Sequence, residues 1–167
     1  MLHEPACYER LRTEVNPFME RMHDDIMGNM THDAVKELSY VKMAYQETLR
    51  RDSPAGISST GTVLEDITVG GVHLKPGDAF WMSMFSVHHD IEQWREPSRF
   101  VPDRFDPSYK EWYLRPNGER RAQYAWCPFF GGPRMCIGTR LAELALKTVI
   151  PLWYHFFDFE FVKHEHT

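Results

Sequence analysis

The spacing of apolar residues predicts two helices near the start of the chain. Residues 4–27 form the first, with apolar side chains every three or four positions. Pro17 lies inside this run, and we expect a break or kink there because proline removes a backbone hydrogen bond. After a turn at 28–32, a second helix is predicted at 40–51, with Ser39 as its N-cap. The apolar positions of the two helices are Tyr8, Leu11, Val15, Phe18 and Met22, then Leu38, Val41, Tyr45 and Leu49.

The pattern then changes to short β signals. Residues 53–62 are rich in Pro, Gly, Ser and Thr and are predicted to form a loop or irregular strand. Residues 67–69 and 72–74 flank a Gly-Gly pair, which predicts a hairpin with a two-residue turn. The sequence at 75–78 is typical of a second turn. Residues 79–85 are expected to form a strand, or a strand that runs into a short helix.

The remaining pattern predicts coil, one long helix and a last strand. Residues 94–127 are dense in Pro, Arg and aromatics and indicate a long ordered coil, with 107–123 polar enough to be a surface excursion. An apolar stripe predicts a helix over 137–153, and alternating Phe and acidic residues at 156–162 favour a strand. We therefore expect one mainly α domain with a small β component, which suits 167 residues.

Composition narrows the class of protein. Hydrophobic residues make up 43% and charged residues 26%, which is typical of a globular chain. A net charge of -5 gives no basic face for nucleic acid. There is no apolar run long enough to span a membrane. Cys7, Cys127 and Cys136 form no C-x-x-C pair, which disfavours a zinc cluster and favours reduced thiols in, or facing, the cytosol.

One cysteine has an unusual setting. Cys136 lies in the segment Phe-Phe-Gly-Gly-Pro-Arg-Met-Cys-Ile-Gly, residues 129–138, where glycines and a proline require a tight backbone. A helix predicted to begin at Cys136 would direct its positive dipole end at the sulfur and stabilise a thiolate. Arg134 could bind a carboxylate, and Gly138 leaves room for a flat ligand. An inert buried cysteine beside a glycine turn remains the alternative, because most structural cysteines are inert.

The whole segment resembles the haem-binding loop of the cytochrome P450 family, F-x-x-G-x-R-x-C-x-G. Phe129, Gly132, Arg134, Cys136 and Gly138 occupy all the fixed places of that pattern. The resemblance implies that these residues bind haem b, with Cys136 as the axial thiolate of the iron and Arg134 paired with a haem propionate. A thiolate ligand gives electron density to iron and favours O–O cleavage.

A second match is the pair Glu47 and Arg50, which fits the E-x-x-R pattern of the same family. Alone, a Glu and an Arg at this helical spacing would usually form a solvated ion pair. The resemblance implies instead a buried triad with Arg104, from the segment Phe-Val-Pro-Asp-Arg-Phe. Such a triad would be structural rather than catalytic, holding the coil and the cysteine loop against the helix.

The resemblance extends over residues 1–167 and implies the C-terminal, haem-binding portion of the P450 fold. An incomplete domain is expected, because no acid-Thr motif of the oxygen-activating helix and no N-terminal region are present. Ser58, Ser59, Thr60 and Gly61 stand where the family usually carries a further basic residue directed at a propionate. Thr60 could replace that contact only weakly.

The resemblance implies an oxidoreductase that inserts one oxygen atom from O2 into a small apolar organic substrate, with electrons from an NADPH-linked reductase. We expect the chain alone to be inactive or poorly folded. Two alternatives stay open: a non-catalytic haem-binding or interaction module, and a haem-thiolate isomerase or peroxygenase that needs no reductase. The compartment is left open as well, although a full-length parent could face the cytosol from the endoplasmic reticulum membrane.

Other polar residues favour ordinary roles. His88, His89 and Asp90 lack a third ligand at helical spacing, so surface or haem-edge packing is expected rather than a metal site. Cys127 is interpreted as a small core residue and Cys7 as an inert helical thiol. Residues 163–166 are expected to form a solvated tail.

Overall fold

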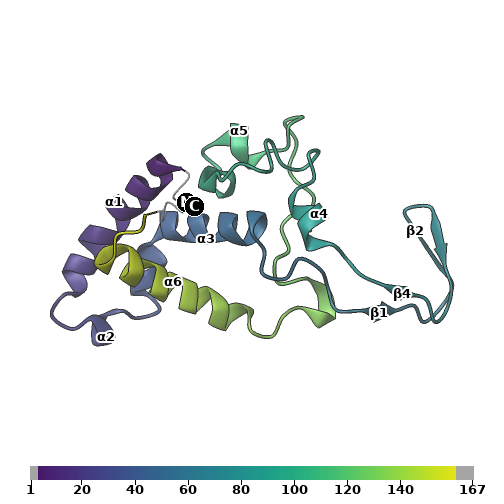
Figure 1. Cartoon of the computed structure of the whole chain (residues 1–167), viewed down its shortest axis with the longest axis horizontal. Coiled ribbons are helices and arrows are strands. Elements are labelled where there is room, and N and C mark those ends of the chain that lie inside the picture. The colour runs from purple at the N-terminus through teal and green to yellow at the C-terminus, as the bar shows by residue number, and fades with distance from the viewer. Residues whose placement is uncertain (1–3, 161–167) are drawn as a thin grey trace, which may run out of the picture.

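Three helices pack together in the computed structural model, which describes residues 4–160 of the chain. They are α1 (Pro5–Met22), α3 (Ser39–Arg51) and α6 (Thr139–Phe156). In Figure 1 they lie side by side, and two thin β ribbons extend away from them as an arm. Mainly α structure with a small β component is therefore confirmed. No helix in the described part of the chain is long and apolar enough to cross a membrane.

The core forms where α1 and α3 meet. Leu11, Val15 and Phe18, three of the apolar positions expected in α1, are buried. Burial of such side chains contributes roughly 1.5–3 kcal/mol each relative to exposure. The remaining buried members of the cluster are Met19, Val35, Leu38, Tyr40, Val41, Met43 and Ala44.

Pro17 does not break α1, so that part of the prediction is wrong. The helix continues through it to Met22, and a separate short helix, α2 (Ile26–Asn29), follows. An internal proline costs about 3 kcal/mol of helix stability. Val15, Phe18 and Met19 lie on both sides of Pro17 and are all buried, so packing of the continuous helix offsets that cost.

Ser39 is not the N-cap of α3 either. It is the first residue of the helix, and its hydroxyl donates to a carboxylate oxygen of Glu14 in α1 at 3.1 Å. The same carboxylate accepts the backbone N–H groups of Tyr40 and Val41, at 2.9 and 2.8 Å. Negative charge at a helix N-terminus is favourable, so a residue from another helix performs the capping.

The predicted hairpin is confirmed. Strands β2 (Ile67–Val69) and β3 (Val72–Leu74) pair antiparallel with Val69 opposite Val72. The two turn glycines have φ of 56° and 82°, the left-handed region that glycine adopts without strain. Strands β1 (Gly61–Thr62) and β4 (Ala79–Phe80) form a second pair, and α4 (Met84–His88) follows, as in the strand-to-helix alternative.

The coil from Trp94 to Cys127 carries two short helical pieces, η2 (Pro102–Phe105) and α5 (Lys110–Tyr113). The η2 piece packs on α3.

The end of the chain differs from the prediction, because α6 continues to Phe156 and residues 157–160 form no strand. The rest of the predicted strand, and the tail at 163–166, lie outside the described residues. Two further 3-10 turns are η1 (Ala34–Glu37) and η3 (Gly132–Arg134).

Candidate functional site

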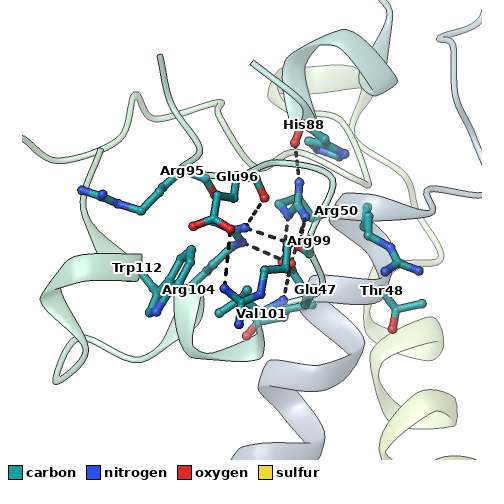
Figure 2. A network of polar contacts seen from close by, with 12 residues as sticks. Glu47, Thr48, Arg50, His88, Arg95, Glu96, Arg99, Val101, Arg104 and Trp112 are labelled. Atoms are coloured by element: carbon teal, nitrogen blue, oxygen red, sulfur yellow. Dashed lines mark hydrogen bonds and ion pairs between the residues drawn. The ribbon is translucent and has the colours of Figure 1, made fainter. Parts of the chain in front are cut away.

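A buried ion-pair network joins α3 to the coil. The Arg50 guanidinium binds both carboxylate oxygens of Glu47, at 2.7 and 2.9 Å. Arg104, from η2, donates to the same carboxylate at 3.2 Å. The three side chains are 0% exposed and point toward one another in Figure 2. The structure thus brings Glu47, Arg50 and Arg104 together in the interior, where the isolated E-x-x-R pair would have favoured the surface.

Backbone groups complete the network. Both guanidiniums use their remaining N–H groups on carbonyls, and the Val101 N–H donates to Glu47 at 2.8 Å. Buried charges are tolerated only when their hydrogen bonds are satisfied, and each bond here fixes a point of the coil relative to α3. The carbonyls that accept from Arg50 and Arg104 belong to His88, Arg95, Glu96 and Arg99.

A third arginine lies next to the network, and sequence reasoning missed it. Arg121 was expected in a surface excursion, yet it is half-buried and its guanidinium lies 4.2 Å from the centre of the Trp94 ring. It also donates to the Arg104 carbonyl. Desolvation lowers the pKa of Arg121 to about 10, and the charge of Arg104 adds to this. The burial of Arg121 depends on packing against residues distant in sequence, which the polar residues around it do not indicate.

The cysteine loop is held by its backbone. The Cys136 N–H donates to the Phe129 carbonyl at 2.9 Å, which closes the loop. Phe130 and Gly132 have φ of 62° and 70°, so the chain turns sharply twice. At position 132 nothing lies within 4 Å of an added Cβ, so the conformation rather than space requires glycine. The loop leaves the Cys136 side chain exposed.

The other predicted residues share this loop. Arg134 lies in η3 and is exposed, while Phe129 is partly buried. Gly138 lies beside the thiol, since an added Cβ there would be 3.7 Å from the Cys136 sulfur. The structure therefore groups Phe129, Gly132, Arg134, Cys136 and Gly138 in one loop, separate from the buried ion pairs.

The helix after the loop begins later than expected. Its first residue is Thr139, not Cys136, and Gly138 occupies the N-cap position. The bond from Cys136 N–H to Phe129 and the preceding 3-10 turn hold the cysteine outside the helix. The Thr139 hydroxyl donates to the Cys136 carbonyl at 2.7 Å. The thiol thus precedes the helix rather than lying in its first turn.

An apolar cavity of about 290 Å³ lies against the loop. Gly131 allows this close packing, because an added Cβ would be 2.6 Å from the Tyr124 ring. Ile137, directly after the cysteine, is fully exposed, and Leu141 is 72% exposed. The cavity is lined by Met82, Met84, Val87, Tyr124, Cys127, Phe130, Gly131 and Gly132.

The side chains that could bind a metal indicate which kind of cofactor the chain can hold. Among residues 4–160, no group of three or more His, Cys, Asp or Glu side chains could hold a metal ion. One exposed thiol beside apolar side chains instead suits a metal that arrives with most of its ligands in a flat organic ring. Haem is such a group, and cysteine thiolate is one of its protein ligands. The residues present therefore fit haem better than a bare ion.

Four polar residues outside the two motifs have structural surroundings of their own. His88 is fully buried, so the surface position expected for it is wrong. His89 stacks on Phe85 with ring centres 4.2 Å apart. Cys7 is half-buried, and burial raises the pKa of its thiol, as expected for an inert cysteine. The Thr60 hydroxyl accepts a hydrogen bond from the Trp81 indole at 2.9 Å and lies on the β arm.

Comparison with known proteins agrees with the motifs. The family model for cytochrome P450 matches residues 1–167. Thromboxane-A synthase of Rattus norvegicus is 34% identical over 93% of the chain, and cytochrome P450 3A5 of Homo sapiens is 32% identical over 82%. Probable cytochrome P450 6a13 of Drosophila melanogaster is 32% identical over 98%. The chain spans only 26% to 30% of the length of these relatives. It belongs to the cytochrome P450 family.

Proposed function

We propose that this chain is the C-terminal haem-binding portion of a monooxygenase and that Cys136 is the axial ligand of haem b. The observation that supports this most strongly is an exposed thiol on a closed glycine loop. The first residues of that loop line an apolar cavity. The thiolate is the ligating form of cysteine, and exposure leaves the sulfur accessible to a metal. Ile137 and the cavity side chains would contact the flat face of the cofactor.

Bound haem would supply the redox chemistry, and the chain would supply position and charge. Cys136 would donate electron density from its sulfur. Arg134 would bind a haem propionate through its guanidinium. A planar guanidinium matches the geometry of a carboxylate better than the ammonium group of a lysine does. The Glu47 network would hold the coil, and through it the loop, so that the sulfur stays at a fixed place.

In the whole protein we infer a reaction in which one atom of O2 enters a small apolar substrate and the other leaves as water. That balance requires two electrons and two protons, with the electrons supplied by an NADPH-linked reductase.

The test is an absorption spectrum of the chain reconstituted with haem, reduced, and exposed to carbon monoxide. Three proteins are compared: the wild type, Cys136→Ser and Cys127→Ser. A strongly red-shifted Soret band is expected in the wild type and in Cys127→Ser, and its loss is expected in Cys136→Ser. A band that survives in Cys136→Ser would overturn the assignment of the ligand.

A further inference from the structure

His88 connects the buried charge network to the cysteine loop. Its carbonyl accepts a hydrogen bond from Arg50 at 2.8 Å, and its ring Nε2 accepts one from the Cys127 N–H at 3.1 Å. The side chain is fully buried. Figure 2 shows His88 directly beyond the Arg50 guanidinium, at the end of α4. One residue therefore contacts the network through its backbone and the loop through its ring.

We propose that His88 is a positioning residue, whose ring nitrogen anchors the start of the cysteine loop and so sets where the Cys136 sulfur lies. This inference rests on the proposed role of Cys136 as the iron ligand. His88 would not touch the iron or the substrate, and it would act only through Cys127 and the backbone that follows.

The backbone between His88 and the sulfur is continuous in hydrogen bonds. Cys127, held by the His88 ring, accepts the Phe130 N–H at 2.9 Å through its carbonyl. The Phe129 carbonyl then accepts the Cys136 N–H at 2.9 Å. A displacement of Cys127 would thus be passed to the cysteine through two short backbone bonds.

A second anchor lies one residue earlier. The Trp126 indole donates to the Gln46 carbonyl of α3 at 3.2 Å. Trp126 fixes the distance of the loop from α3, whereas His88 fixes the amide of the next residue. Two adjacent bonds from different elements restrict rotation of the loop as well as its distance.

The ring must be neutral and in one tautomer for this role. Since Nε2 accepts, the proton of the neutral ring lies on Nδ1. That Nδ1 is buried and has no hydrogen-bond partner among the described residues. Burial, with the nearby charge of Arg50, lowers the pKa of His88 to about 4, so the acceptor persists at neutral pH. The ring is therefore oriented by its bond to Cys127 and not by a partner on its other nitrogen.

The hydrogen bond itself can be measured in the wild-type chain. NMR of the 15N-labelled, haem-reconstituted protein in its diamagnetic, reduced, CO-bound form should show a scalar coupling between the Cys127 amide nitrogen and a His88 ring nitrogen. Such coupling exists only where an N–H···N bond is made. Its absence from resolved signals of both residues would overturn the proposal without any substitution.

Variants then test what the bond does. His88→Gln keeps an acceptor near the place of Nε2, whereas His88→Leu keeps the bulk and removes the acceptor. The matched controls are His89→Gln and His89→Leu, because the His89 ring contacts only Phe85 of its own turn in the bonds described. The readouts are the share of haem with a red-shifted CO band and the rate at which a maleimide labels Cys136 in the haem-free chain.

In His88→Leu we expect the ratio of red-shifted to unshifted haem to fall about fivefold, the equilibrium effect of one lost hydrogen bond. His88→Gln should recover most of that ratio, and the His89 variants should match the wild type. Equal ratios in His88→Leu and the wild type would overturn the inference and leave Cys136 as the ligand. No red-shifted band in the wild type would instead contradict the proposed function. If His88→Leu does not fold, the coupling in the wild type decides.

Discussion

The charge network and the cysteine loop differ in how far this chain completes them. Glu47, Arg50 and Arg104 are all 0% exposed, and their bonds are made by side chains and carbonyls of the same chain. Cys136 is exposed and Ile137 is fully exposed. Earlier residues of the same loop, Phe130 to Gly132, line an apolar cavity. One region is closed within the chain, whereas the other presents a thiol and apolar surface outward.

The difference indicates that the charge network supports the fold, whereas the cysteine loop carries the residues that would act on the cofactor. The network needs no ligand to satisfy its hydrogen bonds, so we expect it to contribute to folding before haem binds. The loop gains its contacts only when a flat apolar cofactor covers it. Substitutions in the first region should therefore change stability with or without haem, whereas those in the second should act mainly on haem uptake.

The largest effect is expected for Glu47→Gln. The amide keeps the shape of the carboxylate but removes its charge, which leaves two buried guanidiniums without a counter-ion. Breaking a buried ion pair in this way costs about 3–5 kcal/mol. Urea unfolding of the haem-free chain, followed by tryptophan fluorescence, measures the loss.

The matched control is Glu37→Gln. Glu37 pairs with Arg21 at 2.8 Å, but both side chains are more than half exposed. Exposed pairs contribute about 0–1 kcal/mol. If Glu47→Gln lowered the free energy of unfolding no more than this control, the network would not be a main support of the fold.

A smaller effect is expected from acid. The pKa of His88 is lowered from its usual 6.5 to about 4, because burial disfavours the charged ring. Between these values the unfolded chain binds a proton that the folded chain does not. Stability is thus highest above pH 6.5 and falls as pH is lowered toward 4, by about 3 kcal/mol from this group.

The measurement compares urea unfolding of the wild type and His88→Gln at a series of pH values. The difference between the two proteins isolates His88 from other titrating groups. That difference should change steadily from pH 6.5 to 4.5, with the wild type losing more on acidification. Parallel curves would show that the His88 ring is not held neutral by the fold.

The smallest effect on stability is expected for Ile137→Ser. The side chain is fully exposed, and surface substitutions usually change the free energy of unfolding by less than about 0.5 kcal/mol. Haem titration should nevertheless show roughly tenfold weaker uptake, because an apolar contact with the cofactor is lost. Unchanged uptake would place the cofactor away from Ile137.

Local features of the fold could be predicted from sequence because their causes are local. The Gly70-Gly71 turn determines the hairpin register, and apolar spacing locates α1 and α3. The motif around Cys136 locates the loop. Its helix start could not be predicted, because the Phe129 carbonyl holds the cysteine outside the helix.

Long-range pairings explain the remaining errors. Glu14 caps α3 from another helix, so the predicted N-cap role of Ser39 is wrong. Glu47 lies away from the apolar stripe, and its burial depends on two distant partners, the Arg104 side chain and the Val101 N–H. The predicted surface position of Arg121 is wrong for a similar reason, since its partner Trp94 is far from it in sequence.

The most direct test of the account is X-ray absorption at the iron edge of the haem-reconstituted chain. The account predicts one sulfur atom in the first coordination shell of the wild type and of Cys127→Ser, and none in Cys136→Ser. A wild-type iron without a sulfur ligand, or a sulfur that persists in Cys136→Ser, would contradict it.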